Sequence, residues 1–142
     1  MMRYALLVLA LMTGSANAAD TLVGRWKLTD YTMNWADTGE VTHPRGQNAL
    51  GYLEYSPGGR MSVIISSADL KATDAFAGTY KVQGNKYVAH VEISTAPDLV
   101  GKDVGRTFEI RGDRLTVTTD VSQTSITNQR PGSVTSTWQR IE

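Results

Sequence analysis

The clearest fold signal in this chain is VGRTFEIRGDRLTVTT, residues 104–119. Apolar and polar residues alternate on both sides of Gly112-Asp113, a dipeptide typical of the two-residue loops in β-hairpins. A loop of that length places four apolar side chains on one face of the hairpin: Phe108, Ile110, Leu115 and Val117. The pattern predicts two antiparallel strands with one face buried.

Arg106 continues the apolar row at the end of the hairpin away from the turn, opposite Thr119. A guanidinium that is buried without a partner is costly, so Arg106 must meet a carboxylate or keep contact with water. An acidic ligand would supply that partner through paired hydrogen bonds. We therefore expect Arg106 to bind ligand; an internal ion pair or a residue at the rim with its charged head in water are the alternatives.

The same alternation recurs along the chain, separated by turn residues such as Pro57-Gly58-Gly59 and Gly84-Asn85. It predicts eight strands, over residues 22–35, 50–56, 60–66, 78–83, 86–94, 104–111, 114–119 and 134–141. Residues 36–49, 95–104 and 122–133 are expected to be loops. Residues 67–76 have the only helical character, with Ser67 as the cap of a short turn that lies over an opening.

The order of these strands predicts an all-β fold. Eight antiparallel strands that neighbour one another in sequence can close into an up-and-down barrel, which leaves no exposed edge. Such a barrel is just wide enough to hold one small ligand. The short connections favour the barrel over a two-sheet sandwich, the competing arrangement.

The first residues have the features of a signal peptide. Arg3 precedes an apolar run, and Ala16-Asn17-Ala18 fits the small-residue rule for cleavage. We expect a signal peptide over residues 1–18, a domain over residues 19–142 and a periplasmic or secreted protein. Cysteine is absent, so the domain must be held together by its core.

Composition argues against several classes of function. The chain has 142 residues, with 14 Lys and Arg balanced by 14 Asp and Glu, so a nucleic-acid interface is not expected, nor stable membrane insertion once the signal peptide is cleaved. With only His43 and His90 and no Cys, we expect neither a metal site nor a cofactor. A small hydrophobic or amphipathic molecule is the expected partner; the oligomeric state stays open.

Three residues carry a resemblance to lipocalins. Gly24-x-Trp26 on the first predicted strand resembles the lipocalin Gly-x-Trp signature, and Arg140 on the last strand matches the basic residue that packs over this Trp. Residues 51–63, which read GYLEYSPGGRMSV, and GDRLT at residues 112–116 resemble the bacterial and fungal lipocalin-like domain family more closely. The chain departs from that family at Ala89, where members have a second His. The resemblance implies a calycin-type barrel with a ligand cavity and no settled activity.

Four further side chains are expected to line the interior: Tyr55, Tyr80, Met61 and Phe108. Aromatic rings and a thioether suit a cavity that accepts an apolar guest, and they suit a filled core equally well. We interpret them, together with Arg106, as the ligand-binding set.

His90 and Glu92 lie two residues apart on one strand, so they share a face about 7 Å apart and are weak candidates for an acid–base pair. The register of the hairpin at Gly84-Asn85 decides where they point. A two-residue loop turns His90 and Glu92 outward and turns the odd-numbered row inward, namely Tyr87, Ala89, Val91 and Ile93. A three-residue bulged loop reverses this arrangement. The apolar odd-numbered row favours the first register.

The sequence therefore predicts an exported barrel that binds a small hydrophobic ligand, with or without an acid group. Two alternatives remain open. One is a non-hydrolytic isomerase or cyclase that uses the cavity with His90 and Glu92. The other is an interaction or inhibitor module that presents its loops to another protein.

Overall fold

The computed structural model describes residues 21–122 and 127–142. The expected signal peptide, residues 1–18, lies outside the described residues. Nine strands follow in order: β1 (Gly24–Trp35), β2 (Val41–Thr42), β3 (Leu50–Tyr55), β4 (Arg60–Ser66), β5 (Thr73–Gln83), β6 (Lys86–Ser94), β7 (Asp103–Arg111), β8 (Arg114–Asp120) and β9 (Gly132–Arg140). A 3-10 turn, η1 (Pro97–Leu99), precedes β7. No helix in this part of the chain is both long enough and apolar enough to cross a membrane.

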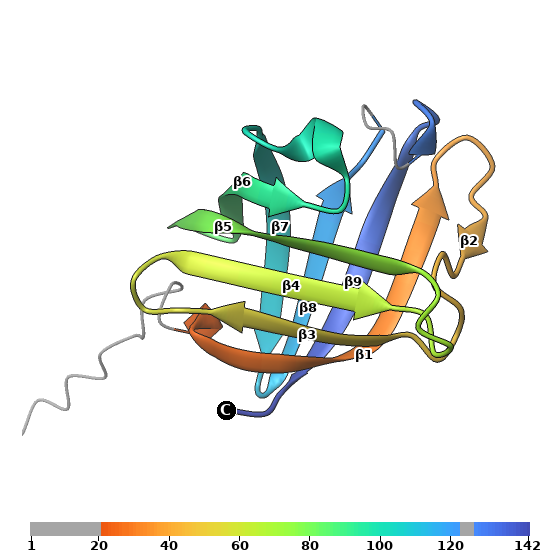
Figure 1. Cartoon of the computed structure of the whole chain (residues 1–142). Coiled ribbons are helices and arrows are strands. Elements are labelled where there is room, and N and C mark those ends of the chain that lie inside the picture. The colour runs from red at the N-terminus through yellow and green to blue at the C-terminus, as the bar shows by residue number, and fades with distance from the viewer. Residues whose placement is uncertain (1–20, 123–126) are drawn as a thin grey trace, which may run out of the picture.

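The strands form a closed antiparallel barrel (Figure 1). Each strand from β3 to β9 pairs with the next, and β1 pairs with β3 on one side and with β9 on the other. The short strand β2 adds to the far part of β1, at Met33 and Asn34. Eight strands therefore close the up-and-down barrel expected from the sequence, and the sandwich is excluded.

Three hairpin registers are as the turn residues predict. Ile110 pairs with Leu115 across Gly112-Asp113, and Tyr55 pairs with Met61 around Gly58. Val82 pairs with Tyr87 across the two-residue loop Gly84-Asn85. Because side chains alternate along a strand, these registers fix which residues enter the barrel.

The short turn expected after Ser67 is present, but it ends at Ala72, and the helical character expected as far as residue 76 is wrong. Ser67 to Ala72 form a tight polar turn, and β5 already begins at Thr73. The Ser67 hydroxyl accepts a hydrogen bond from the Ala72 amide at 3.1 Å, and the Asp69 carboxylate accepts one from the Lys71 amide at 3.0 Å. Such side-chain bonds to the backbone compete with helix formation.

A bulge in β6, opposite Ala77 and Gly78 of β5, corrects the expected position of Ile93. The pairing shifts between Ala77 and Gly78, so that Gly78 pairs with Val91 and Ala77 pairs with Ile93. Val91 is buried, whereas Ile93 is 67% exposed. A side chain at Gly78 would lie 1.9 Å from the His90 carbonyl oxygen, so the close approach at this bulge requires glycine.

A second bulge lies in β1, between Leu28 and Asp30. Trp26 and Leu28 are buried before it, and Met33 is buried after it. The extra residue shifts the alternation by one position, so Tyr31 rather than Asp30 turns toward the interior.

Trp26 and Arg140 pair at one end of the barrel, where the Arg140 amide donates a hydrogen bond to the Asp113 carbonyl in the β7–β8 turn. Trp26 is fully buried, and its indole Nε1 donates a hydrogen bond to the Leu22 carbonyl at 3.0 Å. Gly24 has φ +139°, and a side chain there would collide with the Glu142 carbonyl oxygen at 2.4 Å. Trp26 therefore fills this end of the barrel, and Gly24 allows the C-terminal residues to pack closely against it.

Candidate functional site

A cavity of about 140 Å³ lies inside the barrel, toward the end opposite Trp26. Its wall is mostly apolar, with Val63, Ile65, Phe76, Val104 and Val117 among the lining residues. An engineered apolar cavity of about 150 Å³ in another protein binds benzene, so the space suits a guest of roughly one ring. The barrel is thus not filled completely by its own side chains.

Arg106 projects from β7 into the wall of this cavity. Its Nη1 donates a hydrogen bond of 2.5 Å to the Thr119 hydroxyl, and its guanidinium carbon lies 5.0 Å from the centre of the Phe76 ring. No carboxylate among residues 21–122 and 127–142 lies within 4.0 Å of the guanidinium. Arg106 is therefore a half-buried cation without an acidic partner in the described part of the chain.

The two remaining nitrogens of Arg106 differ in their surroundings. Nε is fully buried and has no hydrogen-bond partner, whereas Nη2 is without a described partner but is not fully buried. Nη2 therefore keeps some exposed surface, and Arg106 is one of the residues that line the cavity. A guanidinium in this state can accept a bound anion without breaking an existing ion pair.

Tyr31 lines the same cavity from β1. Its hydroxyl makes no hydrogen bond to any residue that the structure describes. The pKa of Tyr31 is raised to about 12, chiefly by burial and then by the nearby Asp74 carboxylate, while Arg45 and Arg106 act in the opposite direction. At neutral pH Tyr31 is therefore an uncharged phenol whose hydroxyl proton no described residue accepts.

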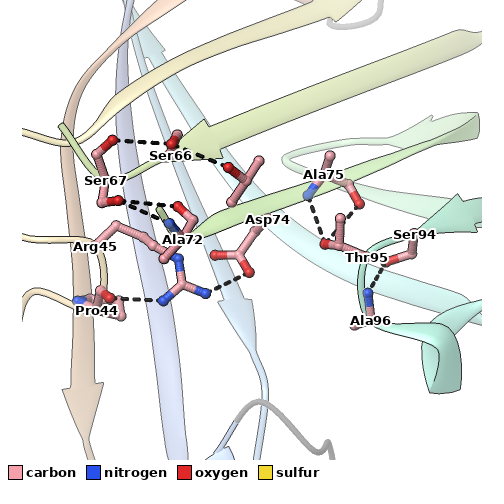
Figure 2. Close-up of polar contacts among 11 residues, drawn as sticks. Pro44, Arg45, Ser66, Ser67, Ala72, Asp74, Ala75, Ser94, Thr95 and Ala96 are labelled. Carbon is pink, nitrogen blue, oxygen red and sulfur yellow. Dashed lines mark hydrogen bonds and ion pairs between the residues drawn. The ribbon is translucent and has the colours of Figure 1, made fainter. Parts of the chain in front are cut away.

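Two carboxylates lie toward the rim. Figure 2 shows Arg45 reaching from the β2–β3 loop to Asp74 at the start of β5, where Arg45 Nη2 and Asp74 Oδ1 are 2.7 Å apart. Asp120 lies at the end of β8 and accepts hydrogen bonds from the amide and the hydroxyl of Ser122. These bonds lower the pKa of Asp120, so it is ionised at neutral pH.

A second cavity, of about 230 Å³, adjoins the first and shares Tyr31 and Asp74 with it. It lies between β1 and the β2–β3 loop, where Trp35 donates a hydrogen bond of 3.0 Å from Nε1 to the Thr42 hydroxyl. Pro44 and Arg45 line it as well. The Arg45–Asp74 ion pair thus borders both spaces.

The structure divides the expected ligand-binding residues into two layers. Arg106 and Met61 line the cavity. Tyr55, Tyr80 and Phe108 are absent from its wall and pack beneath it, where the Tyr55 and Tyr87 hydroxyls share a hydrogen bond of 2.7 Å. The lower layer is a packed aromatic core, and ligand contact by any of these residues stays a prediction.

His90 and Glu92 both lie on the outer surface of β6. His90 Nδ1 is 2.8 Å from Asp103 Oδ1, and Glu92 Oε2 is 2.5 Å from Arg60 Nη2. Each residue has its own exposed partner, and neither lines the cavity. The expected outward register is therefore confirmed.

The sequence pattern does not identify three residues of the cavity wall, Tyr31, Phe76 and Asp74. The change of phase from Trp26 and Leu28 to Tyr31 and Met33 is a visible signal for the bulge in β1. No comparable signal marks the contact between Phe76 and Arg106, because it joins side chains of strands that are not adjacent in the sheet. Within the described residues, no group of three or more His, Asp or Glu side chains is placed to hold a metal ion.

Comparison with protein families agrees with this geometry. The lipocalin-like domain family matches residues 23–74 and 67–141, which together span all the barrel strands up to Arg140. No curated protein matches the chain. With its Gly24–Trp26–Arg140 plug and its closed eight-stranded barrel, the chain belongs to the lipocalin-like domain family.

Proposed function

We propose that this protein is exported and binds a small hydrophobic molecule in the barrel cavity, with an acid group of the ligand on Arg106. Export is supported by the sequence of residues 1–18. Binding is supported by an apolar cavity of a size that accepts a small organic guest.

The observation that carries the proposal is the state of Arg106. A cation that is half-buried among apolar and aromatic groups normally has an acidic partner, because removal from water is costly. Arg106 contacts Thr119 and Phe76 and no described carboxylate. A ligand carboxylate on Nη2 would compensate for part of that cost.

A catalytic role for His90 and Glu92 gains no support from the geometry. Both point away from the cavity and are engaged with surface partners. A proton shuttle needs a group within hydrogen-bond reach of the bound molecule, so we favour a binding protein.

Native mass spectrometry of protein purified from its host tests the proposal. We expect a co-purifying small molecule that is lost from the Arg106→Ala variant and retained by Arg111→Gln, which changes an outward arginine of the same strand. Titration with a panel of small acids and their esters gives a second readout. Absence of a co-purified molecule together with no binding across the panel would contradict the proposal.

A further inference from the structure

We infer that the cavity selects a compact monocarboxylic acid of about one ring, held by Arg106 and the Tyr31 hydroxyl together. This inference rests on the proposed function and specifies its ligand class. It follows from four features of the site: the free donors, the position of the acids, the volume and the fixed guanidinium.

The free donors come from two sides of the barrel. Arg106 Nη2 belongs to β7 and the Tyr31 hydroxyl to β1, and both line one cavity without a hydrogen bond to a described residue. A carboxylate has two acceptor oxygens, so it can take one hydrogen bond from each. Because the pKa of Tyr31 is about 12, the phenol stays a donor and adds no negative charge beside the ligand.

The acids of the cavity wall limit the ligand to one negative charge. Arg106 is the only cationic residue among the described lining residues, and the two acids in the wall lie near strand ends, where the Asp74 side chain is 43% exposed and Asp120 is exposed. Asp74 already forms an ion pair with Arg45, whereas among the described residues Asp120 accepts hydrogen bonds from the uncharged Ser122 and has no cationic partner. A second anionic group that pointed toward the rim would meet these carboxylates and be repelled.

The volume sets the size of the ligand. The cavity beside Arg106, of about 140 Å³, accepts one ring and its substituent, and by itself it is too small for an extended fatty-acid chain. Aromatic side chains in the wall, among them Phe76, Tyr87 and Trp138, offer edges and faces to a ring.

Phe76 and Thr119 hold the guanidinium in place before a ligand arrives. The Phe76 ring lies 5.0 Å from the guanidinium carbon, and the Thr119 hydroxyl accepts a hydrogen bond from Nη1. A donor that is already oriented loses little conformational entropy when it binds, so Arg106 acts as a preorganised anchor.

Calorimetric titration with four probes tests the inference. Phenylacetate is the compact monoacid, and isobutylbenzene has the same heavy-atom shape with an uncharged group in place of the carboxylate. 1,4-Phenylenediacetate adds a second carboxylate at the far end of the ring, and palmitate is the long-chain acid. We expect phenylacetate to bind at 1:1 and at least about tenfold more tightly than each of the other three.

Two variants with matched controls locate the anchor. Arg106→Gln should weaken phenylacetate by about thirtyfold and Tyr31→Phe by about tenfold, with less than about threefold change for isobutylbenzene. Arg111→Gln and Tyr52→Phe change an outward arginine and an outward tyrosine, and both should leave the affinity for phenylacetate as it is. Circular dichroism of each variant verifies the fold.

The outcomes separate this inference from the proposed function. Equal affinity for isobutylbenzene and phenylacetate, or no effect of either cavity variant, would contradict the preference for a monocarboxylic acid. The proposal that the protein binds a small molecule in its cavity would still hold. Tighter binding of palmitate or of the diacid would overturn the size or charge selection in the same way. No binding of any probe, together with no co-purified molecule, would overturn both.

Discussion

The guanidinium carbon of Arg140 lies 4.1 Å from the centre of the Trp26 ring. Arg140 Nη1 also donates a hydrogen bond of 2.9 Å to the Val23 carbonyl, and Nη2 donates one to the Thr21 carbonyl. These contacts join the last strand to the start of the first. They stabilise the closed end and leave the opposite half of the barrel available for a ligand.

Removing the contacts of Arg140 with Trp26 and with the start of β1, here called the Arg140 clamp, should destabilise the whole barrel. Arg140→Ala loses a cation–π contact and the two hydrogen bonds to the Val23 and Thr21 carbonyls, and we expect the free energy of unfolding to fall by about 2 kcal/mol. Urea denaturation measures the change. Arg114→Ala, on the exposed face of β8, should change stability by less than about 0.5 kcal/mol; equal effects of the two variants would argue against the clamp.

The bulge at Gly78 gives a second stability prediction. A methyl group at this position would meet the His90 carbonyl oxygen at 1.9 Å, so Gly78→Ala should cost at least about 2 kcal/mol as the two strands separate. Gly105→Ala is the matched control, because a side chain there meets nothing within 4 Å. Thermal or urea unfolding of both variants checks the prediction, and a neutral Gly78→Ala would show that the bulge is not needed.

The parts of the fold that could be predicted are those set by local turns. The two-residue loops at Gly112-Asp113 and Gly84-Asn85 fix the register of four strands, and the alternation then places Phe108 inside and His90 outside. The resemblance to lipocalins supplied the Trp26–Arg140 pair. Neither inference needed a long-range contact.

The rest depends on irregular backbone and on contacts across the barrel. The bulges after Leu28 and at Gly78 reverse the alternation, which turns Tyr31 inward and Ile93 outward. Alternation alone also cannot rank residues by depth: it predicts Tyr55 and Phe108 on the same inner face as Arg106, although they pack in a lower layer. Depth follows from the tilt of closed strands, which is a property of the whole barrel.

The outward His90 and Glu92 give a prediction about function. The variants His90→Ala and Glu92→Ala should retain the ligand affinity of the unmodified protein within about twofold, because neither residue lines the cavity and both interact at the surface, where ion pairs contribute little. Titration with the ligand that co-purifies, or with phenylacetate, gives the comparison. A loss of affinity of tenfold or more would show that His90 or Glu92 contributes to ligand binding.

Tyr31 gives a prediction about pH. Its pKa is about 12 in the folded protein, against an ordinary value of 10.0, so the folded state retains the phenolic proton where the unfolded chain has lost it. Stability from this group is complete below about pH 10 and is lost as the pH rises toward 12, by up to about 3 kcal/mol. Urea denaturation at a series of pH values should show this loss.

Tyr31→Phe separates this contribution from those of other buried tyrosines. Burial also raises the pKa of Tyr55 and Tyr87, so the variant should still lose stability at high pH, and less steeply than the unmodified protein. Because the Tyr31 hydroxyl has no hydrogen-bond partner in the described chain, stability at pH 7 should change little. Identical pH profiles for the two proteins would contradict the raised pKa.

A crystal structure of the protein with phenylacetate tests the central claim most directly. We predict one molecule in the barrel cavity, with a carboxylate oxygen about 2.7–3.1 Å from Arg106 Nη2 and the other within reach of the Tyr31 hydroxyl. The ring should lie among Phe76, Val104 and Val117. A carboxylate at the rim with Arg106 left uncontacted, or a barrel interior that excludes the acid altogether, would contradict the account.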